Sequence, residues 1–421
     1  MQKLKKFLSP RRLMIILSTL IIVLSISFVN EQSQSETQAI VTVMAMDIVD
    51  NQIELACSII TPTNEEASKS NLYSARADTI VEAVEIIGLQ LGKDLGFSQC
   101  DIVAVGQTLV ETGIDIGLDY LTRTKKVGKN VLLLKFDGKT TDFINASIYL
   151  KQDLSLELAQ VLQYNKEYML AVDSSIENFY LGFYSEAGLS IIPKIKLTEE
   201  PAIKGIKVVL ENSTAGNEET VNQTGGDGSG EASGGEPKEM YLVNDGETIV
   251  LKNGKKILDL YPEDIQRLNL FIKDSRYGAM KVENVSDSIY KDATVVMEIE
   301  DKKSDLNFKF KNGKPVVQLS VSLYLKVEQI IEKDKNKKLL TREDQLLTDA
   351  VSEKVSEKIK DEINYSFDKM QSSNLDILNF YDSFNKFHYK KWQKYLNSLE
   401  NKDEYLKGVE IEMDINVAQY L

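Results

Sequence analysis

The stretch AIVTVMAMDIVDNQIELACSIITP, residues 39–62, opens the main body of the chain with two extended runs of residues. The first run alternates small and larger side chains, and every second residue of the later run is apolar: Ile53, Leu55, Cys57 and Ile59. Such alternation places these side chains on one face of a strand. Between the runs, residues 47–51 contain Asp and Asn, which favour a tight turn. The stretch therefore predicts an antiparallel hairpin that ends at Pro62.

Strand and helix signals alternate from this hairpin to about residue 210. Residues 63–77 are polar and predict a loop. Residues 78–96 carry apolar side chains at helical spacing, with Asp78 available as the N-cap and Gly92 near the end. Further predicted elements are strands at 101–106 and 131–138, one or two helices between them, and helices around 140–150 and 173–185. This alternation predicts a mixed α/β domain over residues 37–210.

Residues 212–238 form a Gly-rich insert with seven glycines and no aromatic residue. A segment of this composition cannot bury enough apolar surface to offset the entropy lost on ordering, so we expect a flexible connection. The glycines do not indicate a phosphate-binding loop, because no Gly-Lys-Ser/Thr sequence follows them.

Two smaller mixed α/β domains are predicted after the insert, over residues 239–302 and 303–421. In the first, Asp245–Gly246 and Asn253–Gly254 indicate hairpin turns, and a helix is expected from Glu263 to about residue 272. Strands are expected near 279–285 and 294–300.

The last domain is predicted to place a long helix on a sheet. Residues 306–328 predict a long hairpin that turns at Asn312–Gly313. Thr341 can cap a helix whose apolar residues recur every four positions: Leu347, Val351, Val355, Ile359, Ile363 and Phe367. Residues 374–395 are also expected to be helical, and residues 409–421 form a closing strand with Val409, Ile411, Met413, Ile415 and Val417 on one face.

The N-terminal part of the chain predicts export. Residues 13–29, LMIILSTLIIVLSISFV, carry no charge, and residues 1–12 before them are basic with no acid. Seventeen helical residues cover roughly 25 Å, near the short limit for a bilayer core of about 30 Å. We favour a single transmembrane anchor with residues 1–12 in the cytoplasm. A signal peptide cleaved before Phe28 is the alternative, and both interpretations place the remaining chain outside the cytoplasm.

The composition limits the function. The 421 residues include 64 acidic and 50 basic side chains, for a formal net charge of −14. Nucleic-acid binding rewards clustered Lys and Arg, so this balance argues against it. The only cysteines are Cys57 and Cys100, which we interpret as buried free thiols, or as a pair if their strands are neighbours. A single histidine excludes a multi-histidine metal site.

The helix predicted at 374–395 carries the one candidate interaction site. Four of its side chains fall on one face at spacings of four and three residues: Phe384, His388, Trp392 and Tyr395. Two interpretations stay open, a core-facing cluster and a partner-docking face, with the core favoured. His388 lacks a nearby nucleophile motif such as Gly-x-Ser-x-Gly, so we predict no catalytic residue, no metal site and no cofactor.

Several motifs, taken in order, resemble the Ger(x)C proteins, the C-subunit family of bacterial spore germinant receptors. They are residues 43–47 (VMAMD), 95–97 with 101–106 (LGF, DIVAVG), 118–123 (LDYLTR), 241–258, Asp376–Ile377 with Phe380, 390–392 (KKW) and the closing VEIEMDINV strand. Three features depart from the family pattern. The chain has no lipid-attachment cysteine after residues 13–29, Asn379 replaces a usual glycine, and the final strand lacks a basic-x-x-Gly ending.

The resemblance implies a non-enzymatic, three-domain extracytoplasmic subunit that assembles with A-type and B-type membrane subunits at the spore inner membrane. That complex responds to small-molecule nutrients. The function we predict is therefore a membrane-anchored assembly subunit of a spore germinant receptor. The alternative is an unrelated extracytoplasmic sensing or adhesion module on a single-pass anchor, and a polysaccharide hydrolase is a distant third.

Overall fold

A computed structural model describes residues 14, 17–20, 38–60, 70–123, 127–149, 154–167, 169, 171–199, 205–210, 238–272, 278–332 and 346–420. Of the predicted anchor at 13–29, only Met14 and residues 17–20 are described, and they are helical. The rest of the anchor and nearly all of the Gly-rich insert lie outside the described residues. Within the described part, no helix is both long enough and apolar enough to cross a bilayer.

The larger of two sheets contains eleven strands. In chain order they are β1 (Gln38–Val49), β2 (Gln52–Ile60), β3 (Ser70–Ala77), β4 (Asp94–Gly96), β5 (Ile102–Val105), β6 (Leu132–Asp137), β7 (Leu189–Thr198), β8 (Gly205–Leu210), β9 (Lys238–Val243), β10 (Thr248–Lys252) and β11 (Lys255–Leu260). Their order across the sheet is β11-β10-β7-β6-β5-β1-β2-β3, with β4 on β1 and β8–β9 beside β7. The central strands β1, β5, β6 and β7 are parallel, and antiparallel strands flank them.

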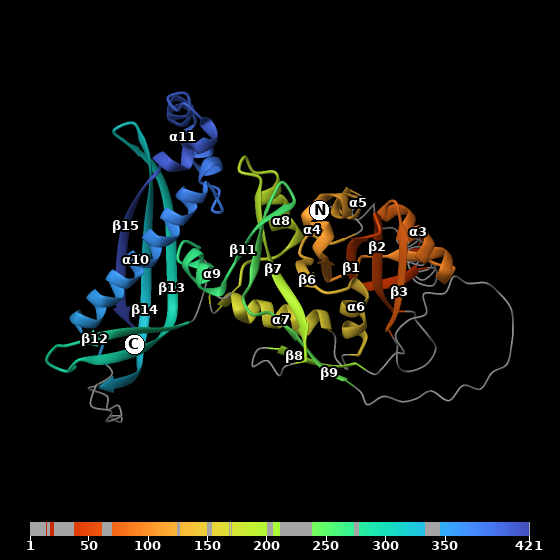
Figure 1. Ribbon diagram of the computed structural model, residues 1–421, viewed down its shortest axis with the longest axis horizontal. Helices are drawn as coiled ribbons and strands as arrows, with labels where there is room; N and C mark the ends of the chain where they lie inside the picture. The colour runs from red at the N-terminus through yellow and green to blue at the C-terminus, as the bar shows by residue number, and fades with distance from the viewer. Residues whose placement is uncertain are drawn as a thin grey trace, which may run out of the picture.

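Helices cover both faces of this sheet (Figure 1). On one face the apolar sides of α3 (Ile80–Leu91), α4 (Gln107–Thr112), α5 (Asp115–Arg123) and α8 (Ile176–Phe183) share a core. On the other face α6 (Thr140–Tyr149) and α7 (Leu154–Glu167) cover a second, smaller core. The predicted burial of β6 on both faces is confirmed, because its residues 133–136 are all buried.

The predicted opening hairpin is confirmed. β1 pairs with β2 in antiparallel register, and the turn residues Asp50 and Asn51 both have positive φ, as this tight turn requires. The predicted helix after it is also present. Its N-cap is Thr79 rather than Asp78, because Thr79 and Glu82 form a reciprocal capping box. Gly92 ends the helix in the left-handed conformation.

Two expectations in this half of the chain are wrong, and one helix was missed. Residues 70–77 of the expected loop form β3, whose polar side chains suit an edge strand. Helix α7 was not predicted. Asp245–Gly246 does not make a hairpin, because β9 and β10 do not pair with each other but follow one another along the same side of β7. Only Asn253–Gly254 turns the chain back, joining β10 to β11.

The smaller sheet has the order β12-β13-β14-β15. Its strands are β12 (Ala279–Val285), β13 (Ala293–Lys311), β14 (Lys314–Glu332) and β15 (Glu410–Gln419), and its helices are α9 (Pro262–Asn269), α10 (Asp349–Ser373) and α11 (Phe380–Leu396), with a 3-10 helix, η1 (Lys402–Gly408). The predicted hairpin at Asn312–Gly313 is confirmed. The predicted apolar stripe of the long helix is also confirmed, since its residues from Val351 to Phe367 are buried.

Several predicted boundaries shift. Helix α10 begins after the N-cap Thr348, whereas Thr341 lies outside the described residues. Helix α11 begins at Phe380 rather than at residue 374. β10 and β11, expected in a middle domain, belong to the large sheet, and β13 runs without interruption through residues 302 and 303. The three-domain division at 37–210, 239–302 and 303–421 stays a prediction, while the mixed α/β class is confirmed.

A buried lysine fastens the two sheets together through helix α9. Lys302 on β13 is 2% exposed, and its ammonium donates to the carbonyls of Asn269 and Ile272 at the end of α9 and to the Ser304 hydroxyl, the last at 3.0 Å. The Asn269 side chain in turn donates to the carbonyls of Met169 and Ala171, which belong to the larger half. Carbonyls at a helix end need such donors, and a cation there also suits the helix dipole.

Lys302→Met should lower the free energy of unfolding by about 2–4 kcal/mol, because buried carbonyls lose a charged donor. Chemical denaturation of the full chain measures this change. Lys303→Met is the matched control, since the Lys303 side chain is 69% exposed and should change stability by less than about 0.5 kcal/mol. Equal stability of the two variants would contradict the fastening role of Lys302.

Strand β15 is held to the hairpin by a carboxylate that reaches across β14. Glu412 accepts from the ammonium groups of Lys309 at 2.6 Å and Lys311 at 2.7 Å, both on β13. These two lysines lower the pKa of Glu412 to about 2 from its ordinary value of 4.5. Glu410 accepts similarly from Lys314 at 2.6 Å. The closing strand therefore depends on charge pairing as well as on its backbone register.

Because the pKa of Glu412 is depressed in the folded chain, its contribution to stability is complete above about pH 4.5 and is lost as pH falls toward pH 2. Glu412→Gln should therefore be less stable than the parent chain at pH 7, and the difference should shrink steadily below pH 4.5. Denaturation curves of both proteins across this range test the prediction. A difference independent of pH would show that the carboxylate charge does not contribute.

Candidate functional site

The four predicted site residues lie on helix α11, and three of them are buried. Phe384 and Trp392 have no exposed surface, and Tyr395 is 8% exposed. Trp392 stacks between the rings of Phe384, at a centroid distance of 5.1 Å, and Tyr395, at 5.3 Å. These three rings belong to the chain's own core, so a partner could reach α11 only through its outward side chains. The docking face composed of the four residues stays a prediction.

His388 interrupts the helix. Its backbone, with φ of −138° and ψ of 38°, is not helical, and its ring nitrogen Nε2 lies 2.6 Å from the carbonyl oxygen of Phe308 on β13. The half-buried imidazole thus ties the helix to the hairpin. The neighbouring side chains Phe387 and Tyr389 are 61% and 60% exposed. Sequence reasoning found the aromatic cluster, but it could not tell inward from outward rings across an unpredicted kink.

A buried carboxylate supports the start of α11. Asp376 accepts from the backbone N–H groups of Phe380 and Tyr381, each at 2.8 Å, and from the Tyr405 hydroxyl at 2.7 Å. Burial raises the pKa of Asp376, and these three donors oppose that change. Asn379 precedes Phe380 with φ of 54°, a left-handed conformation that glycine adopts freely and asparagine tolerates. The sequence motif around residues 376–380 therefore stabilises the N-terminus of α11.

A second pair of motif residues meets at the ends of β1 and β5. The Asp47 carboxylate Oδ1 accepts from the backbone N–H of Leu109 at 2.8 Å, which holds the first turn of α4. Gly106 lies beneath that carboxylate, and a Cβ atom placed on it would stand 2.2 Å from Asp47 Cγ. Burial raises the pKa of Asp47, while its backbone hydrogen bonds lower it. Asp47 and Gly106, which are far apart in the sequence, thus meet in one contact beside the start of α4.

The two cysteines are buried and free, as favoured from the sequence. Burial raises the pKa of the Cys57 thiol and raises that of Cys100 to about 12. Both groups are therefore protonated and unreactive near neutral pH, and they act as core side chains.

A charged cluster around one buried lysine at the end of β6 was missed by sequence reasoning. Lys135 is 1% exposed and pairs with Asp137, and Lys194 pairs with Asp137 at 3.0 Å and with Glu247 at 2.7 Å. Burial lowers the pKa of Lys135 to about 8, and the nearby Lys194 and Lys256 contribute in the same direction. The signal was present, because a lysine inside the apolar run VLLLKFD is unusual. Its charge is met by groups of the same chain, which indicates a structural role.

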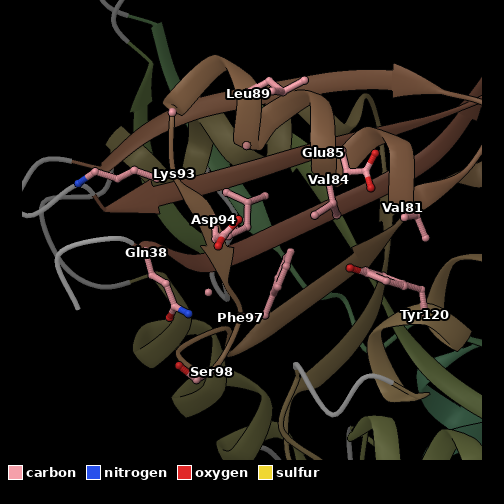
Figure 2. A pocket seen from close by; sticks show the side chains of 14 residues that line it. Gln38, Val81, Val84, Glu85, Leu89, Lys93, Asp94, Phe97, Ser98 and Tyr120 are labelled. Atoms are coloured by element: carbon pink, nitrogen blue, oxygen red, sulfur yellow. The ribbon is translucent and has the colours of Figure 1, made fainter. Parts of the chain in front are cut away.

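A hollow of about 900 Å³ lies beside helix α3, where the chain enters the body at Gln38. Figure 2 shows Val84 and Glu85 of α3 above Phe97 and Tyr120. Leu89 on the same helix is 82% exposed. The lining of the hollow mixes apolar and charged groups, and its donors do not converge on one ligand. In the part of the chain that the structure describes, no group of His, Cys, Asp and Glu side chains is placed to hold a metal.

Comparison with known proteins assigns this arrangement to spore germination. A family described as the spore germination protein N-terminal domain matches residues 31–197, and one described as spore germination B3/GerAC like, C-terminal, matches residues 246–418. Together these matches cover most of the chain. The two matches therefore define the chain as a spore germination protein. The chain belongs to the GerAC-like, or Ger(x)C, family, and the resemblance seen in the sequence is confirmed.

Among solved structures, the crystal structure of the GerBC protein is similar to this chain. It shares 16% sequence identity, with 90% of this chain and 97% of that chain covered and a TM-score of 0.48. No match is found among curated proteins.

Gly106→Ala should lower the free energy of unfolding by about 1–3 kcal/mol, because the added methyl group collides with the Asp47 carboxylate that holds α4. Thermal or chemical denaturation of the full chain measures the loss. Gly128→Ala is the matched control, since the nearest atom to its added Cβ is at an ordinary contact distance of 3.7 Å. If both variants are equally stable, the Asp47–Gly106 contact does not constrain the fold.

Proposed function

We propose that this chain is a non-catalytic, membrane-anchored, extracytoplasmic subunit of a spore germinant receptor. In this role it supports the assembly of A-type and B-type membrane subunits and their response to nutrients. The observation that carries the proposal is the succession of both family domains along one chain. The alternative of an unrelated sensing or adhesion module loses its basis, because the family is established.

The proposed anchor is the apolar segment at residues 13–29, with the basic residues 1–12 in the cytoplasm. Residues 30–37 connect it to Gln38, the first residue of β1. Fully extended, this connection spans at most about 30 Å. The large sheet would therefore begin within that distance of the membrane surface.

A non-catalytic role is supported by how the chain uses its unusual ionisable groups. The carboxylate of Asp376 is occupied by two backbone donors and the Tyr405 hydroxyl. Lys135 and Lys302, both buried, are bound by groups of the same chain. Buried ionisable groups that face a cleft mark active sites, whereas these stabilise strand ends and helix ends.

Deletion of the coding sequence should remove the response of spores to at least one nutrient, and the wild-type chain should restore it. A germination assay in a strain without related receptors measures this response. Co-purification of the tagged chain with two multi-pass membrane proteins is the second expected result. A normal response to every nutrient in that strain would contradict the receptor role.

The anchor has its own test. Replacing Ile21 and Ile22 with Arg should release the chain from the membrane fraction, because each arginine at mid-bilayer costs about 3 kcal/mol. Ile21→Leu with Ile22→Leu is the control and should leave the chain in that fraction. Protease added outside intact cells should digest the body of the wild-type chain, and full protection would contradict the extracytoplasmic location.

A further inference from the structure

The outward side of helix α11 is basic in a chain that is strongly acidic overall. Its four lysines, all exposed, are Lys386, Lys390, Lys391 and Lys394. Within the described residues none of the four is ion-paired with an acid. Figure 1 shows α11 at one end of the molecule, beside the turn between β13 and β14. Positive charge is thus concentrated at a protruding end.

The lysines on the opposite face of the same hairpin behave differently. Lys309 and Lys311 both bind Glu412, and Lys314 binds Glu410. Those charges are met within the chain, although the side chains of Lys311 and Lys314 are 62% and 63% exposed. The unpaired lysines of α11 are therefore a local feature of one face.

A hollow of about 300 Å³ lies between α11 and the hairpin turn. Phe310, Gly313, Lys391, Lys394, Tyr395 and Ser398 line it. Phe387, on the other side of the kink at His388, has an exposed ring that stacks on Phe308 with a centroid distance of 6.5 Å. Two ammonium groups and two aromatic rings thus line the hollow, and the Phe387 ring packs on the strand that supplies Phe310. We name Phe387, Lys390, Lys391 and Lys394, together with the hollow that Lys391 and Lys394 line, the basic–aromatic surface.

We propose that the basic–aromatic surface binds the headgroups of anionic phospholipids. Lysines attract anionic headgroups, and aromatic rings prefer the interface between water and hydrocarbon. In this proposal Lys391 and Lys394, which line the hollow, offer two ammonium groups to a headgroup phosphate, and Phe387 enters the outer part of the acyl region. The inference rests on the proposed membrane location, because a tethered chain presents this surface to lipid at high effective concentration. The body would then contact the membrane at a second point besides its anchor.

The test places a fluorescent reporter on the surface of the full chain. Phe387→Trp adds an exposed indole, while Trp392 remains buried and gives a constant background. The protein is reconstituted into vesicles of brominated phosphatidylglycerol or brominated phosphatidylcholine. We expect blue-shifted, quenched emission in the anionic vesicles only, reversed by high salt.

Changing Lys390, Lys391 and Lys394 to Gln in this background should abolish the quenching. Each lysine contributes roughly five-fold to binding an anionic surface, so the three together account for roughly 100-fold. The control changes Lys311 and Lys314 to Gln, which also removes exposed positive charge but from the face paired with Glu410 and Glu412. Quenching should persist in this control.

The outcomes separate this inference from the proposed anchor. The chain could insert into both kinds of vesicle while the new indole stays exposed or is quenched equally in both. Either result contradicts lipid binding by this surface and supports the proposed anchor. Binding to anionic vesicles alone, lost with the three lysines, supports the surface and contradicts the anchor. Blue-shifted emission with soluble polyglutamate but with neither vesicle would overturn the lipid proposal in favour of an acidic protein partner.

Discussion

The need to satisfy the carbonyls at the end of helix α9 governs how the two sheets of this protein meet. Asn269 and Leu270 at that end are buried, and a buried carbonyl without a donor is costly. Lys302 supplies a charged donor from β13, and the Asn269 side chain donates to the carbonyls of Met169 and Ala171. A single apolar core extends from Leu189 and Val250 of the large sheet through α9 to α10 and the small sheet. Hydrogen bonds therefore set the geometry of a junction whose stability comes mainly from burial.

This junction explains which parts of the fold the sequence could predict. Apolar patterns identified β1, β2, α3, β6 and the long hairpin, because each pattern is local and reports the burial of the element that carries it. The pairing of β10 with β7 joins residues 248–252 to residues 189–193 across the insert, and no local pattern contains that information. Asp245–Gly246 illustrates the difference. This dipeptide commonly makes a hairpin turn, but in this protein it lets the chain continue along β7. The length of β13 was hidden because its polar middle, residues 300–305, contains the lysine that reaches α9.

The candidate site shows a similar division. The aromatic spacing of α11 correctly indicated a cluster, and the core interpretation holds for Phe384, Trp392 and Tyr395. The kink at His388 depends on a hydrogen bond to Phe308, which is eighty residues away in the sequence. Because the kink turns Phe387 and Tyr389 outward, the exposed part of the helix could not be deduced from its helical spacing. Motif residues such as Asp47 with Gly106 and Asp376 with Phe380 prove to be supports for helix starts.

The backbone of Asn379 shows how the start of α11 is built. The position has a left-handed conformation, with φ of 54° and ψ of 45°, which glycine adopts freely. Asparagine is the side chain that most nearly replaces glycine in this conformation, because its short amide tolerates positive φ. The Asn379 Oδ1 atom is buried without a hydrogen-bond donor among the described residues. Asp376 compensates, since its carboxylate fixes both Phe380 and Tyr381 and so determines where the helix begins. Asp376 and Asn379 together thus fix the start of α11, while the lysines on its outward face stay exposed.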